Sequence, residues 1–470
     1  MKIPDLSALF GEHRIYLLNR SATYAIGVAE TVPMAGILSM DSGAEYAYLS
    51  ERLKTEIACW DPRPGWRISQ PDASIDLALP ALEAGLCRML QSDSSAPNSS
   101  GASLWCPRHC RSSRDFAERL GMGIINPLAD ITEMLADKRQ VLPALRDLGL
   151  PTLPGDWLTA SSASYADCAR RFGLPFVLQT RTSDSGAGTT IVREEADYLA
   201  ACRRFSGEEL WVAPFATDLS VNINACVTAE DVFVAYPSVQ LTGFPFLNAA
   251  PPRYCGNDYA ASARLSKTNH RDLAGQTYRI GKWLASLGFE GVFGLDYVMG
   301  RDGRFCPVDL NPRWQGSTAL LAQAEQISGR IPLPVLGLAA HLGLFSRTEL
   351  CRFGETCAEP VNASQFFLLA PNRSVLCGRQ VRPGIHSLAP EFHWQRDGYH
   401  LADLVRNDEV LLGGAIIPQG IRVEAQVPVL RVFRRGAVLN DTLAGPLPWV
   451  ARAADALYTA LDLQDTDDSL

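Results

Sequence analysis

Long apolar runs are absent from this sequence of 470 residues. None reaches the about 18 residues that a membrane-spanning helix needs, so a membrane protein is not expected. The opening segment, MKIPDLSALFGEHR, carries acidic residues where a signal peptide requires an apolar core. These absences predict a cytoplasmic protein with no membrane partner.

An excess of positive charge is also absent, and lysine is rare. The net charge is −8, which argues against a nucleic-acid partner. Only five of the 43 basic residues are lysines, namely Lys2, Lys54, Lys138, Lys267 and Lys282. A lysine that lies inside a motif is therefore slightly more informative than usual.

The sequence lacks cysteine and histidine patterns that indicate a zinc site or a side-chain nucleophile. The 12 cysteines are scattered, and Cys106 and Cys110 flank His109 without CxxC spacing or a second pair. We expect ordinary thiols in a reducing compartment. His270 begins a predicted helix and is expected to be structural.

The patterns that are present predict a mixed α/β and α+β fold. A chain of this length needs more than one hydrophobic core. Residues 1 to about 125 alternate short apolar runs with helical stretches, as an α/β unit does. Apolar periodicity predicts a helix over 130–150, which Pro143 kinks or splits. Further along, we expect a strand at 175–180, a small-residue loop at 181–190, a helix at 270–287, a hairpin at 291–311, and short strands from about 350 with a final helix at 450–462.

The predicted hairpin places two carboxylates opposite each other. If Asp302 and Gly303 form a two-residue turn, Asp296 lies directly across the ladder from Asp309. Asn311 then lies on the same face as Asp309. Two carboxylates and an amide oxygen suit Mg²⁺, which would offset their repulsion. The alternative is that one acid faces solvent or pairs with an arginine, and a loop of odd length would break the pairing.

The sequence resembles the ATP-grasp superfamily over about residues 125–330. The segment DLNPRWQGST resembles the common ending E-x-N-P-R-x-x-G-S, and the spacing of Asp296, Asp309 and Asn311 matches the metal ligands of the D-alanine–D-alanine ligase branch. Other motifs follow in the expected order: LADKR with the first ATP-contacting lysine, the glycine-rich lid TSDSGAGTT, the hinge ELWVAPF that takes adenine, and Asp218 for ribose. The resemblance implies an N-terminal α/β pre-ATP-grasp domain (1–125), a subdomain with the lid (126–215), a catalytic subdomain with antiparallel sheets (216–345) and a C-terminal β-rich lobe (346–470).

The same resemblance implies a set of site residues. Catalysis is assigned to Arg313, Lys138 and Lys267, and the metal to Asp296, Asp309 and Asn311. Nucleotide binding is assigned to Lys138, Gln179, Arg181, Ser183, Ser185, Gly186, Gly188, Thr189, Ala213, Phe215 and Asp218. Acyl-substrate binding is assigned to Gln240, Asn257, Asp258, Gly316 and Ser317. Structural alternatives stay open: a flexible turn at 183–190, an exposed helix lysine at 138, a turn residue at 218, a structural ion pair for Arg313, and an inserted loop around 257.

Several positions depart from the family pattern. Gln179 stands where the second phosphate lysine is usual, so Arg181 or Lys267 would have to supply the charge. Pro214 in the hinge has no N–H, which leaves adenine to neighbours such as Phe215. Gly294 replaces an arginine of the D-alanine ligases, and Arg313 is the expected substitute because its fork suits phosphate oxygens.

The resemblance implies an ADP-forming ligase that activates a small carboxylate as an acyl phosphate and joins it to a small amine, as in peptide natural-product pathways. ATP and two Mg²⁺ ions are the implied cofactors, with Mn²⁺ as a substitute, and a homodimer is left open. Three alternatives remain: a ligase that loads a carrier protein as a thioester, a small-molecule kinase, and a non-catalytic ATP-binding regulator.

Overall fold

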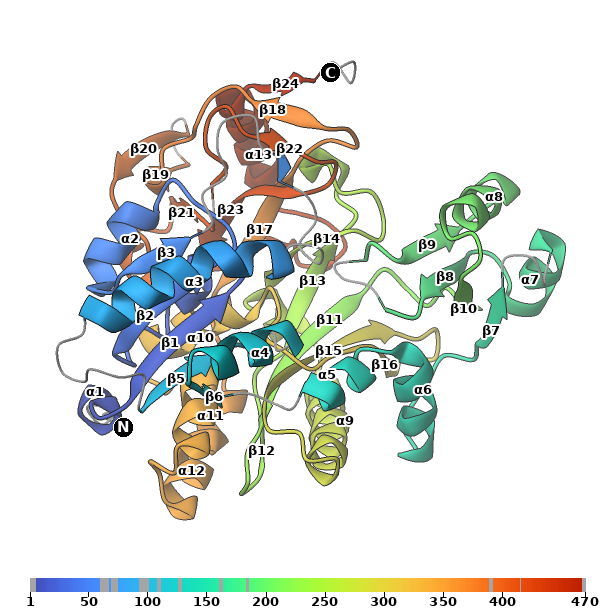
Figure 1. The fold of residues 1–470 in the computed structure, drawn as a ribbon. Helices are drawn as coiled ribbons and strands as arrows, with labels where there is room; N and C mark the ends of the chain where they lie inside the picture. Colours follow the sequence, from blue (N-terminus) through green and yellow to red (C-terminus); the bar gives the residue numbers. More distant parts are fainter. Residues whose placement is uncertain are drawn as a thin grey trace.

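The computed structural model describes residues 6–59, 67–68, 75–92, 101–107, 111–125, 129–159, 164–182, 186–388, 392–414 and 416–466. The described residues form a broad body and a smaller lid region that projects from it (Figure 1). None of the described helices has the length and apolar character needed to cross a membrane.

The N-terminal region is built on a parallel five-stranded sheet. Its order is β3 (Ile57–Cys59), β2 (Met34–Ser39), β1 (Arg14–Asn19), β5 (Ala102–Trp105) and β6 (Gly123–Ile125). Strand β1 reads as a continuous apolar run because both faces of a parallel sheet are covered. Its helices are α1 (Leu6–Phe10), α2 (Tyr46–Leu53), α3 (Ile75–Ser92) and α4 (Arg111–Arg119), and a 3₁₀ turn, η1 (Ala22–Ala25), follows β1.

Two helices lead from this sheet into the lid region. The sequence predicted one helix over 130–150, but the structure has α5 (Ala129–Leu135) and α6 (Lys138–Asp147). The break is not at Pro143, which lies inside α6. It falls at Asp137, whose side chain accepts a hydrogen bond from the Arg139 N–H and so caps α6.

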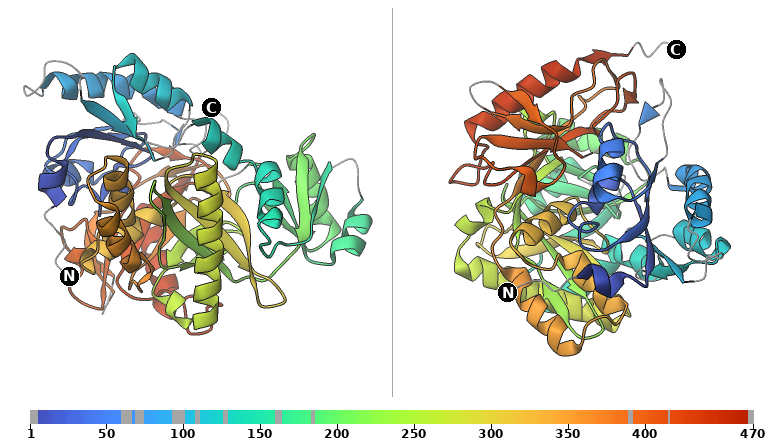
Figure 2. Two further views of the ribbon diagram at one scale, coloured as in Figure 1. Left: turned by 90° about the horizontal axis from the view of Figure 1, so that it is seen from below. Right: turned by 90° about the vertical axis from the view of Figure 1, so that its left-hand side faces the viewer.

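The lid region itself is an antiparallel four-stranded sheet with helices on one side. Its order is β7 (Asp156–Thr159), β10 (Glu209–Pro214), β8 (Phe176–Thr180) and β9 (Thr189–Val192). The helices are α7 (Tyr165–Phe172) and α8 (Glu195–Arg204). The left view of Figure 2 shows this sheet, in green and teal, standing apart from the main body at the right-hand side.

An eleven-stranded sheet forms the main body and runs across the boundary that we predicted near residue 345. Strand β14 pairs with β17 in the C-terminal region, so the predicted catalytic and C-terminal parts share one sheet. The order is β16 (Phe305–Asn311), β15 (Gly291–Met299), β11 (Ser220–Val227), β13 (Ser238–Thr242), β14 (Tyr254–Asp258), β17 (Ser364–Leu369), β23 (Pro428–Arg434), β21 (Glu409–Gly413), β19 (Gly384–Ser387) and β20 (His393–Arg396), with β12 (Val232–Val234) beside β11. The four-part division of the chain stays a prediction.

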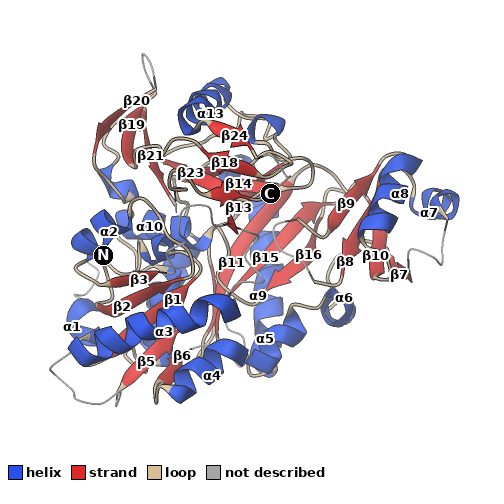
Figure 3. Ribbon diagram, turned by 45° about the horizontal axis from the view of Figure 1, so that its top comes forward, coloured by secondary structure: helices blue, strands red, loops and turns tan. Residues whose placement is uncertain are grey.

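Helices and a small sheet complete the body. Helix α9 (Lys267–Ser286) packs on β11, as Figure 3 shows. The others are α10 (Thr318–Ile327), α11 (Leu333–His341), α12 (Arg347–Gly354) and α13 (Pro448–Leu461), and the small sheet has the order β24 (Leu463–Asp465), β18 (Val375–Cys377), β22 (Arg422–Val423), β4 (Arg67–Ile68). The expected fold class, a parallel N-terminal sheet followed by antiparallel sheets and a β-rich C-terminal region, is confirmed.

The hairpin of β15 and β16 has the predicted pairing but not the predicted turn. The Gly300 N–H donates to the Arg304 carbonyl at 2.8 Å, which leaves a three-residue loop closed by Gly303 at φ 78°. With this loop of odd length alone, Asp296 and Asp309 would be one residue out of register. A bulge beyond the Asp296 pair shifts the register back by one residue, and Asp296 pairs with Asp309 after all.

Candidate active site

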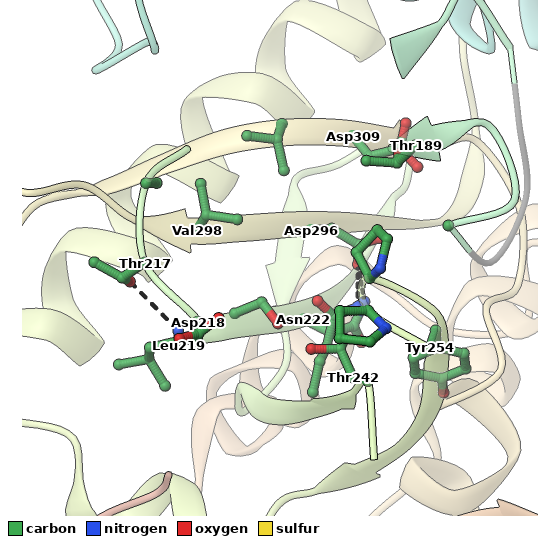
Figure 4. Close-up of a pocket in the computed structure, with 18 of the residues that line it drawn as sticks. Thr189, Thr217, Asp218, Leu219, Asn222, Thr242, Tyr254, Asp296, Val298 and Asp309 are labelled. Atoms are coloured by element: carbon green, nitrogen blue, oxygen red, sulfur yellow. Dashed lines mark hydrogen bonds between the residues drawn. The ribbon is translucent and has the colours of Figure 1, made fainter. Parts of the chain in front are cut away.

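A cavity of about 610 Å³ lies between the lid sheet and the β11–β16 part of the large sheet. Figure 4 shows Asp296 and Asp309 on neighbouring strands, with Asp218 and Tyr254 toward opposite ends of the view. The polar lining includes Lys138, Gln179, Thr189, Asp218, Asn222, Gln240, Asn257, Asp296, Asp309, Asn311, Arg313, Gln315 and Ser317. The fold thus brings together most of the residues that the sequence singled out.

Lys138 contacts one of the paired carboxylates, that of Asp309. It is the first residue of α6, which packs on β16, and only 5% of its surface is exposed. Its Nζ lies 2.6 Å from Oδ1 of Asp309. The Asp137 cap fixes where α6 begins, and therefore where this lysine enters the cavity.

Asp296 is held by amides that the sequence analysis did not connect to it. Its Oδ1 accepts hydrogen bonds from Asn222 at 2.8 Å, Gln240 at 3.0 Å and Gln315 at 3.3 Å. Burial and the facing Asp309 carboxylate raise the pKa of Asp296 to about 7, against the effect of these donors. Asn222 could have been noticed, because β11 is fully buried and yet carries two asparagines, Asn222 and Asn224, on alternate positions and therefore on one face.

Gln315 reaches Asp296 because residue 294 is glycine. A Cβ at Gly294 would lie 1.8 Å from Oε1 of Gln315. The position at which D-alanine ligases carry an arginine is thus filled by a neutral amide from another segment. Gln315 also accepts a hydrogen bond from Asn222 at 2.6 Å. This contact between distant segments has no local sequence signal.

The donor set at the hairpin fits a hard divalent cation. Asp296 and Asp309 face each other, and Nδ2 of Asn311 lies 3.3 Å from Oδ2 of Asp309, so all three side chains share one face. Within the described residues, no group of three His, Cys, Asp or Glu side chains could hold a metal. Two carboxylates and an amide suit Mg²⁺, which leaves its remaining positions to water and phosphate, rather than zinc.

Only some of the predicted phosphate-binding residues are among the residues that the structure describes. Gly186 and Thr189 line the cavity, and Gln179 donates to Oγ1 of Thr189 at 3.2 Å. Ser183 and Ser185, two predicted phosphate ligands, lie outside the described residues, as does Asp184 between them. The Gly188 carbonyl accepts the Thr180 N–H at 3.0 Å and so extends the ladder.

Neither residue that we expected to replace the second phosphate lysine lines the cavity. Arg181 forms an ion pair with Asp137, and 48% of its side chain is exposed. Lys267 is exposed at the first turn of α9. Among the described residues, the only lysine in the cavity lining is Lys138.

The hinge segment lines the other end of the cavity, but not every hinge residue that we expected to bind adenine is a lining residue. Pro214, Phe215 and Asp218 are lining residues, whereas Ala213 is buried in the lid sheet opposite Val177. The Phe215 N–H already donates to the Pro175 carbonyl at 3.1 Å. Phe215 can therefore contribute its ring to a bound base, but not its backbone N–H.

Of the predicted acyl-substrate residues, four line the cavity and one does not. Gln240, Asn257, Gly316 and Ser317 are lining residues. Asp258 is fully buried, and it accepts backbone N–H groups of Ala261, Val438 and Leu439 at 2.7 to 2.9 Å. Its carboxylate thus anchors the C-terminal region.

Arg313, to which the sequence analysis assigned a catalytic role, lines the same cavity. It lines the cavity two residues beyond Asn311, and its Nη1 donates to the Trp314 carbonyl at 3.0 Å. Its positive charge also acts to lower the pKa of Asp296. The arrangement therefore places an arginine beside the paired carboxylates.

No protein-family model matches the chain. It is 33% identical over 86 residues to biotin carboxylase of Haemophilus influenzae, a match over 17% of the chain and 19% of the relative. It is 25% identical over 230 residues to the formate-dependent phosphoribosylglycinamide formyltransferase of Burkholderia pseudomallei, which covers 48% of the chain and 57% of the relative. The matched parts thus span well under two thirds of either relative.

A solved structure is similar over nearly the whole chain. Biotin carboxylase of Campylobacter jejuni aligns with a TM-score of 0.57 and 13% identity, over 96% of this chain and 91% of that one. The chain has the ATP-grasp fold. The N-terminal parallel sheet corresponds to a pre-ATP-grasp domain, and the resemblance seen in the sequence motifs is confirmed. In this ATP-grasp fold, the cavity between the lid sheet and the large sheet is the candidate nucleotide site.

Proposed function

We propose that the protein is an ADP-forming ligase that activates a small-molecule carboxylate as an acyl phosphate and joins it to an amine. The observation that carries the proposal is the group formed by the buried Lys138 and the half-buried Asp309 and Asp296 in a cavity that continues to Arg313. The names of the relatives support it, since one uses formate, which is a carboxylate, and the Campylobacter enzyme is described as a complex with an ATP analogue.

The proposed roles of the site residues follow from their charges. Mg²⁺, held by Asp296, Asp309 and Asn311, would neutralise phosphate charge. Lys138 binds a phosphate oxygen from the lid side, and Arg313 stabilises charge on the transferred phosphoryl group. Asn222, Gln240 and Gln315 keep Asp296 oriented toward the metal. Catalysis then consists mainly of positioning and charge neutralisation, without a side-chain nucleophile.

The finer predictions remain part of this proposal. They are two metal ions, replacement by Mn²⁺, formation of a peptide bond, a role in natural-product assembly, and a homodimer. The three alternatives from the sequence stay open as well. Because the site would bind ATP in each of them, only the products can separate them.

An ADP-release assay distinguishes the proposed ligase from the kinase and the regulator. Full-length protein is incubated with ATP and Mg²⁺ and a matrix of small carboxylates and amines. A ligase releases ADP only when both partners are present. A kinase forms a stable phosphorylated product with one partner, and a regulator binds ATP without turnover. ADP formation with a single partner and a stable phospho-product would contradict the proposal.

A further inference from the structure

The loop between β16 and α10 carries Arg313 and receives contacts from three parts of the chain. We call residues 312–317 the Arg313 loop. Its Gly316 carbonyl accepts a hydrogen bond from Gln365 of the C-terminal strand β17 at 2.7 Å, and its last residue contacts β11. The third contact comes from the N-terminal sheet and reaches Trp314, the neighbour of Arg313.

Trp105, at the carboxyl end of β5, packs against Trp314. The two ring centres lie 5.0 Å apart with the rings at 89°, which is the edge-to-face arrangement that aromatic pairs prefer. Only 6% of each residue is exposed, and both belong to a hydrophobic core that also contains side chains of β1, α10 and α11. Close packing on all sides leaves the Trp314 ring little freedom to move.

The backbone of Trp314 is held at the same place. Its N–H donates to the carbonyl of Pro107, two residues beyond Trp105, at 3.4 Å. Trp105 and Pro107 also line a gap of about 30 Å³ together with Gly337 of α11, and Figure 1 shows β5 beside that helix. The end of β5 thus contacts both the ring and the backbone of Trp314.

The carbonyl of Trp314 in turn holds the guanidinium of Arg313. It accepts a hydrogen bond from Nη1 of Arg313 at 3.0 Å. This carbonyl belongs to the residue that the N-terminal sheet holds, so the orientation of the guanidinium depends on that sheet. The other two contacts of the Arg313 loop act on Gly316 and Ser317, which lie further from Arg313 along the chain.

The orientation of Arg313 matters for the reaction proposed above. A cation that stabilises a transferred phosphoryl group is effective when it is already in place, because reorienting it during the reaction costs part of the stabilisation. A displacement of about 1 Å can lower a rate by about 100-fold. Side chains that fix Arg313 therefore influence the rate even if they touch neither ATP nor substrate.

We propose that Trp105 is a positioning residue, which holds Trp314 and through it the Arg313 guanidinium in the orientation that receives the transferred phosphoryl group. Arg313 lines the cavity, whereas Trp105 is not one of its lining residues. The inference rests on the proposed function, because it concerns the arginine that stabilises the phosphoryl group there. It gives the N-terminal sheet a part in phosphoryl transfer.

The test compares two nucleotide complexes that differ in their phosphoryl group. Full-length protein with Mg²⁺ is titrated by calorimetry with a non-hydrolysable ATP analogue and, separately, with ADP plus aluminium fluoride. Aluminium fluoride beside ADP imitates a phosphoryl group during transfer, and analogues of a transition state bind more tightly than those of the ground state. The ratio of the two affinities therefore measures what Arg313 contributes, and it needs neither a carboxylate nor an amine.

Single and double variants connect Trp105 to Arg313. Arg313→Lys should weaken binding of ADP with aluminium fluoride about 10- to 100-fold relative to the ATP analogue. Trp105→Ala should weaken it about tenfold, and Trp105→Phe should recover most of the loss because an aromatic ring again packs on Trp314. The double variant Trp105→Ala, Arg313→Lys should bind no more weakly than Arg313→Lys alone, because the effects of coupled residues do not add.

A matched control removes an indole elsewhere. Trp394 lies half-buried on the edge strand β20, under the guanidinium of Arg382, and Trp394→Ala should leave the affinity ratio unchanged. Circular dichroism shows whether each variant is folded. If Trp105→Ala is not, Trp105→Leu provides the test, because it keeps apolar volume in the core but loses the edge-to-face contact with Trp314.

Two results would overturn this inference and leave the proposed function in place. One is an additive loss in the double variant, which would mean that Trp105 supports the fold without acting through Arg313. The other is an equal loss of affinity for both complexes in Trp105→Ala. A wild-type protein that binds the ATP analogue but does not bind ADP more tightly with aluminium fluoride would contradict phosphoryl transfer itself, and the inference with it.

Discussion

The two walls of the central cavity differ in how their side chains are positioned. On the hairpin wall, one pair of adjacent strands fixes Asp296, Asp309 and Asn311 relative to one another. On the opposite wall, the neighbours come from far along the chain: Gln365 donates to Asn257 at 3.4 Å and to the Gly316 carbonyl at 2.7 Å, and behind this lining the buried Asp258 accepts backbone N–H groups near residue 438. Short-range pairing therefore sets the wall that we propose to bind the metal, whereas packing of the C-terminal region sets the wall that we propose to face the substrate.

The largest effect is expected on the hairpin wall. Asp309→Asn removes a charge that both the metal and Lys138 need, so Mg²⁺-dependent ADP formation should fall by about 10³-fold with the fold intact. Steady-state ADP release and circular dichroism measure the two parts of this prediction. Asp302→Asn in the exposed turn of the same hairpin is the matched control and should leave the rate unchanged. Near-normal turnover in Asp309→Asn would remove the metal assignment.

A smaller effect on the same wall concerns the fork of Arg313. Arg313→Lys keeps the charge but loses bidentate contact with phosphate oxygens, so kcat should fall about 10- to 100-fold while the affinity for ATP changes little. Rates at saturating substrate and ATP titrations separate the two quantities. Arg304→Lys, in the exposed turn, serves as the control. An unchanged kcat in Arg313→Lys would mean that its role is structural.

Behind the opposite wall, the buried Asp258 should affect stability rather than substrate binding. Asp258→Asn replaces an acceptor oxygen by an amide group and breaks bonds to the segment at 438–439, at a cost of about 2–3 kcal/mol in the free energy of unfolding. Urea unfolding measures this loss. Gln240→Met, in the cavity lining, should show the opposite pattern, with lower activity and little change in stability. An altered KM in Asp258→Asn at unchanged stability would restore the substrate role.

The smallest effect concerns the contact between the lid region and the opposite wall. A Cβ at Gly186 would lie 2.9 Å from the Pro252 carbonyl oxygen, and the residue has φ 77°. Gly186→Ala should weaken ATP binding about tenfold, or about 1.4 kcal/mol. Gly207→Ala carries a similar positive φ with open space around it, so it reports the backbone cost alone. Equal ATP affinities in the two variants would show that the contact has no role in binding.

The features that could be predicted from the sequence are those that depend on short-range strand pairing, and the features that could not depend on packing between distant segments. The order of motifs identified the fold, and the spacing of Asp296, Asp309 and Asn311 identified their shared face. The register was right although the turn was not, since a three-residue loop and a bulge compensate each other. The contact of Lys138 with Asp309 and the amides around Asp296 depend on packing between distant segments. For the same reason Lys267, a lysine near the expected motifs, proved to be exposed outside the cavity.

The central claim is that a carboxylate oxygen attacks the γ-phosphate of ATP in the Asp296–Asp309 cavity. The most direct measurement uses the acid identified in the ADP-release assay, labelled with ¹⁸O in its carboxylate. We predict that one labelled oxygen appears in the released inorganic phosphate for each amide formed by the wild-type protein, and that both products form about 10³-fold more slowly in Asp309→Asn. Label in AMP, or unlabelled phosphate alongside amide formation, would contradict the acyl-phosphate route.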